Sequence, residues 1–299
     1  MKSSVLLIIF NRPDTTKRVF EEIKKAKPKK LYIAADGPRL ERNDDINKCS
    51  QAREIVNDVD WNCVVNTLYS DRNLGCKVAV SRAINWFFSN EEEGIILEDD
   101  CLPSQSFFSF CDDQLAKFRD DKRIFLISGY NKQNTWKEKE ADYFFSNYGG
   151  IWGWASWRRA WMHNDLEMND LEEFIKQNKL KHLLGSKQGK IREKQMRAAK
   201  AGHNMNTWDF QWGYSRHVNS GMACVPSRSL IENIGFGSDA THTSINTSSI
   251  KVKRHELITP LKENRYIIAD KDYDNLFFKD DSILIKIKSK IETTFTRKK

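Results

Sequence analysis

The first 128 residues alternate short apolar runs with polar and amphipathic segments, and this alternation constrains the fold more than any other feature. The apolar runs cover residues 5–10, 31–35, 63–68, 94–97 and 124–128. Short runs of this kind are typical of strands buried on both faces of a parallel sheet. Between the runs, apolar residues such as Val19, Phe20 and Ile23 recur at helical spacing. The sequence therefore predicts an α/β domain with a mostly parallel sheet flanked by helices.

Polar residues follow these runs at the points where the predicted strands end. They are Arg12, Asp36, Arg72 and the acidic triplet Glu98–Asp99–Asp100. Open α/β sheets bind their ligands beyond the carboxyl ends of the strands. We therefore expect a binding site along this edge.

The triplet Glu98–Asp99–Asp100 is the strongest local signal. Three adjacent carboxylates repel one another unless water or a cation neutralises them. Oxygen ligands at a strand end suit Mg²⁺ or Mn²⁺ bridging phosphate oxygens. The alternative is a solvated acidic turn, which the preceding apolar strand disfavours.

Other strand-end residues have both a binding and a structural interpretation. Asp36 can accept a hydrogen bond from a ring N–H such as uracil N3, or it can simply form a turn before Gly37. Arg12 and Lys77 are candidates to neutralise a diphosphate, although basic residues are also common at protein surfaces.

Beyond residue 130 the sequence becomes rich in tryptophan, with seven of the nine tryptophans between Trp136 and Trp212. The cluster at 149–157 suits either stacking on sugar rings or a plain core. Asp209 lies among aromatic residues in the segment 207–212, where desolvation would raise the pKa of its carboxylate and make it a better proton acceptor. The alternative is a structural role as an acidic residue at the N-terminus of a helix. Helices are expected at 171–184 and 191–201, and a strand at 221–225. Structural roles are the default for the lone His217 and His242.

The order of these motifs resembles nucleotide-sugar-dependent glycosyltransferases of the GT-A fold, above all the N-acetylglucosaminyltransferase I group (glycosyltransferase family 13) and related bacterial enzymes. The resemblance spans roughly residues 4–245. The matching segments are VLLIIFNRP (5–13), AADGP (34–38), RNLG (72–75), IILEDDCLPSQSFFSF (95–110), GGIWGWASWRRAW (149–161), TWDFQW (207–212) and GMACVPSRS (221–229).

The resemblance implies a role for each matching residue. Asp100 is implied as the direct ligand of Mn²⁺ or Mg²⁺, and His242 as a second residue on the metal or diphosphate. Asp209 is implied as the catalytic base. The implied donor-binding residues are Arg12, Asp36, Gly75, Lys77, Glu98 and Asp99, and the implied acceptor-side residues are Trp154 and Trp208.

These roles imply an inverting transfer of a sugar, with GlcNAc or another hexose as candidates, from a UDP-sugar to a glycan or lipid-linked glycan hydroxyl. A catalytically inactive scaffold of the same fold is the alternative outside enzymes. A sugar nucleotidyltransferase is the other alternative, but it calls for a glycine-rich basic loop after the first strand, where this chain has NRPDTT.

The net charge of +8 belongs mostly to the C-terminus, because residues 283–299 contain six lysines and arginines and one acid. The nearly neutral body disfavours a nucleic-acid partner. Apolar residues at 283, 284, 287 and 291 recur at helical spacing among lysines, which suits an amphipathic helix on an anionic membrane surface; a disordered or strand-like basic end is the alternative.

The predicted organisation is one glycosyltransferase domain over 1–245 and a C-terminal extension with a basic tail over 246–299. The domain comprises a nucleotide-sugar-binding half (1–130) and an acceptor half (131–245). Six scattered cysteines, no secretory leader and no apolar run long enough for a membrane span favour a cytoplasmic protein with reduced thiols, peripheral at the membrane if the tail binds lipid.

Overall fold

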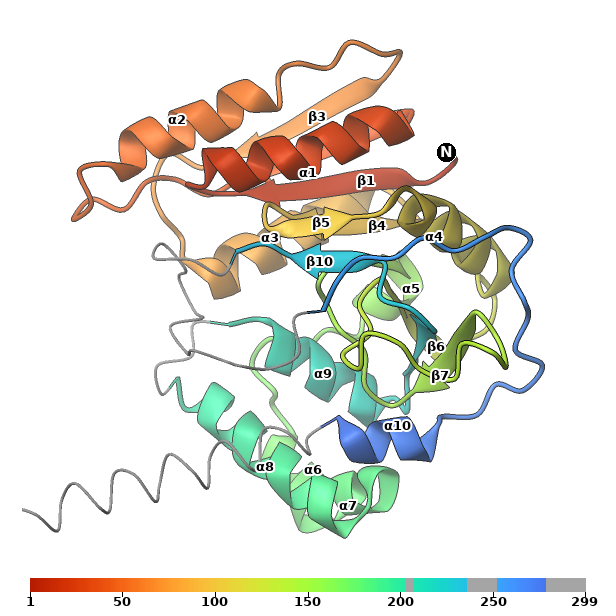
Figure 1. The fold of residues 1–299 in the computed structure, drawn as a ribbon. Coiled ribbons are helices and arrows are strands. Elements are labelled where there is room, and N and C mark those ends of the chain that lie inside the picture. Colours follow the sequence, from red (N-terminus) through yellow and green to blue (C-terminus); the bar gives the residue numbers. More distant parts are fainter. Residues whose placement is uncertain (203–206, 236–251, 278–299) are drawn as a thin grey trace, which may run out of the picture.

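The computed structural model describes residues 1–202, 207–235 and 252–277 (Figure 1). His242 and the basic tail at 283–299 lie outside these residues. The described strands are β1 (Ser4–Ile9), β2 (Lys30–Ala35), β3 (Val64–Tyr69), β4 (Glu93–Glu98), β5 (Cys101–Pro103), β6 (Ile124–Ser128), β7 (Tyr143–Ser146), β8 (Trp154–Trp157), β9 (Met222–Pro226) and β10 (Ile231–Asn233). The described helices are α1 (Pro13–Ala26), α2 (Asp45–Ile55), α3 (Cys76–Asn90), α4 (Gln105–Lys117), α5 (Arg158–Trp161), α6 (Leu171–Lys176), α7 (Lys179–Leu184), α8 (Ser186–Lys200), α9 (Asp209–Val218) and α10 (Lys271–Leu276).

The main sheet confirms the predicted α/β class. Among the described strands its order is β3-β2-β1-β4-β8-β6-β9-β7. The strands from β3 to β4 are parallel, whereas β8 runs antiparallel to both β4 and β6, and β7 antiparallel to β9. Parallel pairing is thus concentrated in the N-terminal half. The sheet is continuous across residue 130, because β4 and β6 both pair with β8.

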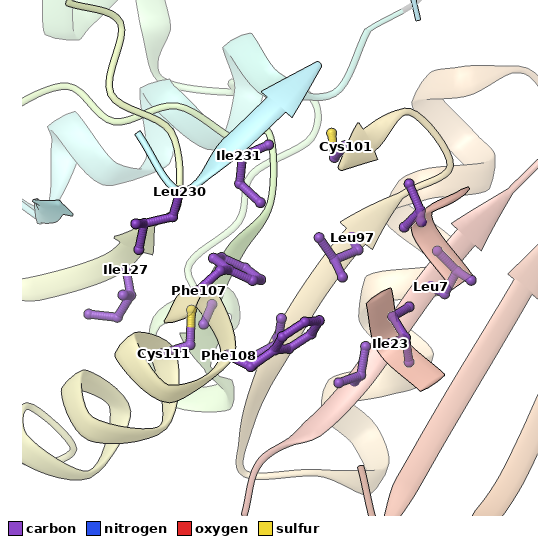
Figure 2. Packing of buried hydrophobic residues seen from close by; sticks show 14 of the residues in the cluster. Leu7, Ile23, Leu97, Cys101, Phe107, Phe108, Cys111, Ile127, Leu230 and Ile231 are labelled. Atoms are coloured by element: carbon purple, nitrogen blue, oxygen red, sulfur yellow. The ribbon is translucent and has the colours of Figure 1, made fainter. Parts of the chain in front are cut away.

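Side chains alternate between the two faces of β1, as expected for a strand buried on both sides. Val5, Leu7 and Ile9 face the side covered by α1, α2 and α4, while Leu6 and Ile8 face α3, α5 and α9. Figure 2 shows the first of these packing layers, where Leu7 and Leu97 lie among side chains of α1 and α4. This three-layer arrangement holds the ends of β1, β2 and β4 at one edge.

A small helical layer covers the C-terminal half of the sheet. The helix predicted over 171–184 is divided into α6 and α7 at Asn178, whose backbone is left-handed with φ 55°. Apolar side chains of α6, α7 and α8 pack together with Tyr214 of α9, and Figure 1 shows α8 beside α9. In the described ranges, no helix has the length and apolar character to cross a membrane.

Residues 252–277, within the predicted C-terminal extension, pack against the body of the domain (Figure 1). The Glu256 carboxylate accepts hydrogen bonds from the backbone N–H groups of Gln105 (3.1 Å) and Ser106 (2.8 Å), capping α4. Helix α10 buries Tyr273 beside β7. The Asp274 carboxylate receives hydrogen bonds from the side chains of Ser146 and Asn147.

Candidate functional site

A cavity of about 620 Å³ opens at the edge where the parallel strands end. It lies beyond β1, β2 and β4, at the N-terminal ends of α3 and α9. The switch between β2 and β4 on either side of β1 is the position where α/β sheets bind their ligands. The sequence-predicted residues that line it are Arg12, Asp36, Gly75, Glu98, Asp99, Asp100, Trp208 and Asp209.

Parallel pairing of β1 with β4 brings Arg12 to the acidic triplet, because Ile8 lies opposite Glu98 in the register. The Arg12 Nη1 donates to Asp100 Oδ2 at 2.6 Å and lies 3.5 Å from Asp99 Oδ1. Arg12 directly precedes Pro13, the first residue of α1, so the helix start holds its backbone in place. Arg12 therefore neutralises part of the triplet within the protein itself.

One arginine does not balance the charge of three carboxylates. Burial raises the pKa of Glu98, and the negative charges of Asp100 and Asp99 raise it further. Burial also raises the pKa of Asp99, with Asp100 adding to the effect and Arg12 opposing it. The site therefore carries excess negative potential that a bound cation would relieve.

The donor set fits a divalent cation that shares its coordination with a ligand. Among the described residues, no three His, Cys, Asp or Glu side chains form a complete metal-binding group. Mg²⁺, however, is commonly held by one or two carboxylates together with substrate phosphates and water. Asp99 and Asp100 both line the cavity and are candidates to supply such a carboxylate; Asp99 accepts the Phe10 N–H at 3.1 Å, and Asp100 is held by Arg12.

Asn233 is a site residue that sequence reasoning missed. It ends β10, whose antiparallel pairing with β5 places it opposite Cys101, and its Nδ2 lies 3.4 Å from Asp100 Oδ1. A Cβ on Gly235 would stand 2.3 Å from Asp100 Oδ2, so glycine is needed for this approach. In the sequence, the glycine of Asn233-Ile234-Gly235 was a signal that the backbone approaches another group closely at this position.

Asp36 lies at the cavity, but its carboxylate is engaged by the loop before α3. It accepts hydrogen bonds from Asn73 Nδ2 (2.9 Å), Leu74 N (2.9 Å) and Gly75 N (3.1 Å), in addition to Gly37 N (2.9 Å). Gly75 has φ 78°, a conformation that favours glycine. Asp36 thus shapes the loop that forms one cavity wall.

Near Asp36, the carboxylate of Asp45 holds Arg39, a basic residue that lines the cavity. Asp45 is 1% exposed and receives a two-pronged contact from Arg39, with Arg39 Nε 2.6 Å from Oδ2 and Nη2 2.9 Å from Oδ1. The Arg39 hydrogen bond lowers the pKa of Asp45 to about 2, against the opposing effect of burial. Arg39 in turn lies over the ring of Phe10, at 5.2 Å from its centroid.

Asp209 is the first residue of α9 and lines the cavity. Its carboxylate interacts with the hydroxyl of Thr207, and its charge contributes to the raised pKa of Glu98. The preceding Trp208 lines the same cavity and stacks on Trp154, with centroids 5.8 Å apart. Trp154 itself is fully buried and does not line the cavity, so the structure assigns it to the aromatic core instead of the predicted acceptor side.

The structure separates the two interpretations of the tryptophan-rich segment. Trp154, Trp157 and Trp161 are buried in the core. Trp152, in contrast, is only partly buried and lines the cavity wall. Lys77 does not line the cavity; its Nζ lies 3.3 Å from Glu167 Oε1 at the surface.

A second cavity of about 190 Å³ adjoins the first. Asp209, Ile151 and Trp152 line both cavities. The second cavity is otherwise formed by Tyr130, residues 147–150, parts of α8 and α9, and Phe277. Asp209 therefore lies at the seam between a large and a small cavity.

Comparisons with known proteins give distant structural similarity alone. No protein-family model matches the chain, and no curated protein matches it. The chain is similar to HddC from Yersinia pseudotuberculosis at 11% identity and TM-score 0.27, over 48% of this chain and 57% of HddC, less than two thirds of that protein.

Two structures of UDP-glucose pyrophosphorylase are also similar. The apo form matches at 8% identity and TM-score 0.37, over 78% of this chain and 93% of that one. The complex with UDP-glucose matches at 10% identity and TM-score 0.26, over 49% and 63%. Overall similarity this low does not assign a function, which is therefore derived from the site.

Proposed function

We propose that this protein is a metal-dependent inverting glycosyltransferase of the GT-A fold that transfers a sugar from a UDP-sugar to a glycan hydroxyl. The observation that supports this most directly is the position of Asp209, which lines both cavities. A base in glycosyl transfer must face the anomeric carbon of the donor and the hydroxyl of the acceptor at once. A carboxylate at the seam of two adjoining cavities meets that requirement.

The larger cavity takes the nucleotide-sugar. Its place beyond β1 and β4 and its volume of about 620 Å³ suit a ligand of that size. Asp100 is the candidate metal ligand, with Glu98 and Asp99 facing the donor. A bound divalent cation supplies neutralisation of the negative charge that develops on the departing diphosphate.

Asp209 acts on the acceptor. Its carboxylate takes the proton of the attacking hydroxyl, the oxygen forms a bond to the anomeric carbon, and the bond from that carbon to the diphosphate breaks, releasing UDP. Attack from the side opposite the leaving group inverts the anomeric configuration. Trp208 and Trp152 offer apolar surfaces beside this position.

The deciding experiment combines UDP binding with a donor screen. Titration calorimetry with and without Mn²⁺ should show at least tenfold tighter UDP binding with the metal, and UDP-sugars should then release UDP in a metal-dependent manner that EDTA abolishes. Tight UDP binding without any turnover would instead identify a scaffold. Formation of pyrophosphate from UTP and a sugar 1-phosphate would identify a nucleotidyltransferase.

A further inference from the structure

The small cavity has an unusual wall of positive charge. Arg192 of α8 and Arg216 of α9 both line it, together with His217. Arg216 is only 3% exposed, and among the described residues it forms no salt bridge. Its hydrogen bonds go to the backbone oxygens of Asn147 (2.9 Å) and Gly221 (3.4 Å).

The charges in this wall repel one another. Burial lowers the pKa of Arg216, the positive charge of Arg192 lowers it further, and Asp274 opposes the effect. The Asp274 carboxylate is already bound by Ser146 and Asn147. A buried arginine without a charged partner is costly, and a carboxylate or phosphate would compensate for it.

Two further polar nitrogen atoms in this wall have no hydrogen-bond partner in the described part of the chain. They are Nε2 of His217, which is 3% exposed, and Nε1 of Trp212, which is fully buried. Burial lowers the pKa of His217, and the positive charges of Arg192 and Arg216 lower it further. Trp212 Nε1 can only donate, which adds a further donor to the cavity wall.

A glycine makes room for one of the arginines. A Cβ at Gly213 would stand 2.6 Å from Arg192 Nη2. The Arg192 guanidinium therefore lies directly against the backbone of α9 at the cavity. A volume of about 190 Å³ suits one sugar ring or a charged substituent, and not a nucleotide.

We propose that this second cavity binds the anionic group, a carboxylate or a phosphate, of an acidic acceptor sugar. The assignment to the acceptor rests on the proposed function, because it is Asp209 at the seam that separates donor from acceptor. The anion chemistry of the cavity rests on its own residues. Arginine is suited to such groups because its planar fork binds two oxygens at once.

The test is titration of the metal-free protein with glucuronate, glucose 6-phosphate, glucose and inorganic phosphate. Without metal, the acidic edge of the larger cavity repels anions. We expect at least one of the two sugar anions to bind about tenfold or more tightly than glucose. Preference for glucuronate identifies a carboxylate acceptor, and preference for glucose 6-phosphate a phosphorylated one. Equal binding of all three sugars would overturn the proposal.

Variants assign the binding to this cavity. Arg192→Gln should reduce the affinity for the preferred sugar anion about tenfold, whereas Arg197→Gln, which removes an equal charge from the exposed side of α8, should leave it unchanged. Gly213→Ala displaces the Arg192 guanidinium without removing charge and favours the helix, so it tests the site if Arg192→Gln fails to fold. Unchanged preference in the folded variants, or equal loss in Arg197→Gln, would overturn the proposal.

The same titration separates this proposal from the proposed function. If UDP with Mn²⁺ fails to bind while the sugar-anion preference persists, the glycosyltransferase assignment fails and the anion site stands. If UDP binds with Mn²⁺ but the sugar anions bind no better than glucose, the anion site fails alone.

Discussion

The two cavities that meet at Asp209 have opposite charge. The described lining of the larger cavity contains five carboxylates and three arginines, whereas that of the smaller contains two arginines and the shared Asp209 as its one carboxylate. Under the proposed function, a nucleotide diphosphate is therefore expected to need a cation in the first cavity. Under the further proposal, a single anionic group is expected to bind the second cavity without one.

The largest expected effect comes from removing the base at the seam. Asp209→Asn keeps the shape of the side chain but cannot take a proton, so transfer should fall about 10²–10⁴-fold. UDP affinity with Mn²⁺ should stay within about threefold, and the sugar anion should bind at least as tightly, because a negative charge is gone. Steady-state kinetics and calorimetry measure both; near-normal turnover would show that another group is the base.

Asp100→Asn tests the acidic cavity. Loss of this carboxylate should reduce the Mn²⁺-dependent gain in UDP affinity about tenfold or more, while UDP binding without metal stays the same or improves. Asp58→Asn is the matched control, since Asp58 is an exposed carboxylate paired with Lys24. A full Mn²⁺ effect in Asp100→Asn would place the metal elsewhere.

Asp36→Asn tests whether Asp36 contacts the uracil ring of the nucleotide or only stabilises the loop before α3. The amide nitrogen would face N–H groups of the loop that now donate to the Asp36 carboxylate. We expect the free energy of unfolding to fall by about 1–3 kcal/mol, measured by urea denaturation. The preference for UDP over CDP should change little in the folded fraction. Normal stability with lost uridine preference would favour direct contact with the base.

We expect the free energy of unfolding to depend on pH through Asp45, because Arg39 balances the charge of this carboxylate. Arg39 lowers its pKa to about 2 from the ordinary 3.8, so this stabilisation is complete above about pH 4 and is lost as the pH falls towards 2. The shift corresponds to about 2 kcal/mol. Asp45→Asn should therefore be less stable by roughly that amount at pH 7, with the gap closing between pH 4 and 2. A stability difference between the wild type and Asp45→Asn that does not change with pH would exclude the Arg39–Asp45 ion pair as its cause.

Lys77→Ala should have the smallest effect. Lys77 pairs with Glu167, whose side chain is 71% exposed, and exposed pairs contribute about 0–1 kcal/mol. The free energy of unfolding should change by less than about 0.5 kcal/mol, and UDP affinity by less than twofold. A tenfold loss of UDP affinity would restore Lys77 to the donor site.

The strands β1, β2 and β4 of the parallel half were readable from the sequence, because they are buried on both faces and their apolar runs are continuous. The expectation of a doubly buried strand was wrong for β3, which lies at the edge of the sheet and is largely exposed. The missed elements are the strands β5, β7, β8 and β10 and the helices α2, α5 and α10. Tyr143–Ser146 and Trp154–Trp157 mix aromatic and small polar residues, and α2 has too few apolar residues for a clear helical stripe. Their structure depends on pairing with distant segments.

By itself the sequence determined the strand ends, and with them the edge that presents Arg12, Asp36 and the acidic triplet, because local periodicity decides where a strand stops. The tertiary structure decided how those groups are used. It paired Arg12 with Asp100, engaged Asp36 in a loop and buried Trp154. It also joined segments more than 60 residues apart, such as Asn147 with Arg216, into a basic cavity. Such contacts depend on packing between distant segments, which local spacing does not record.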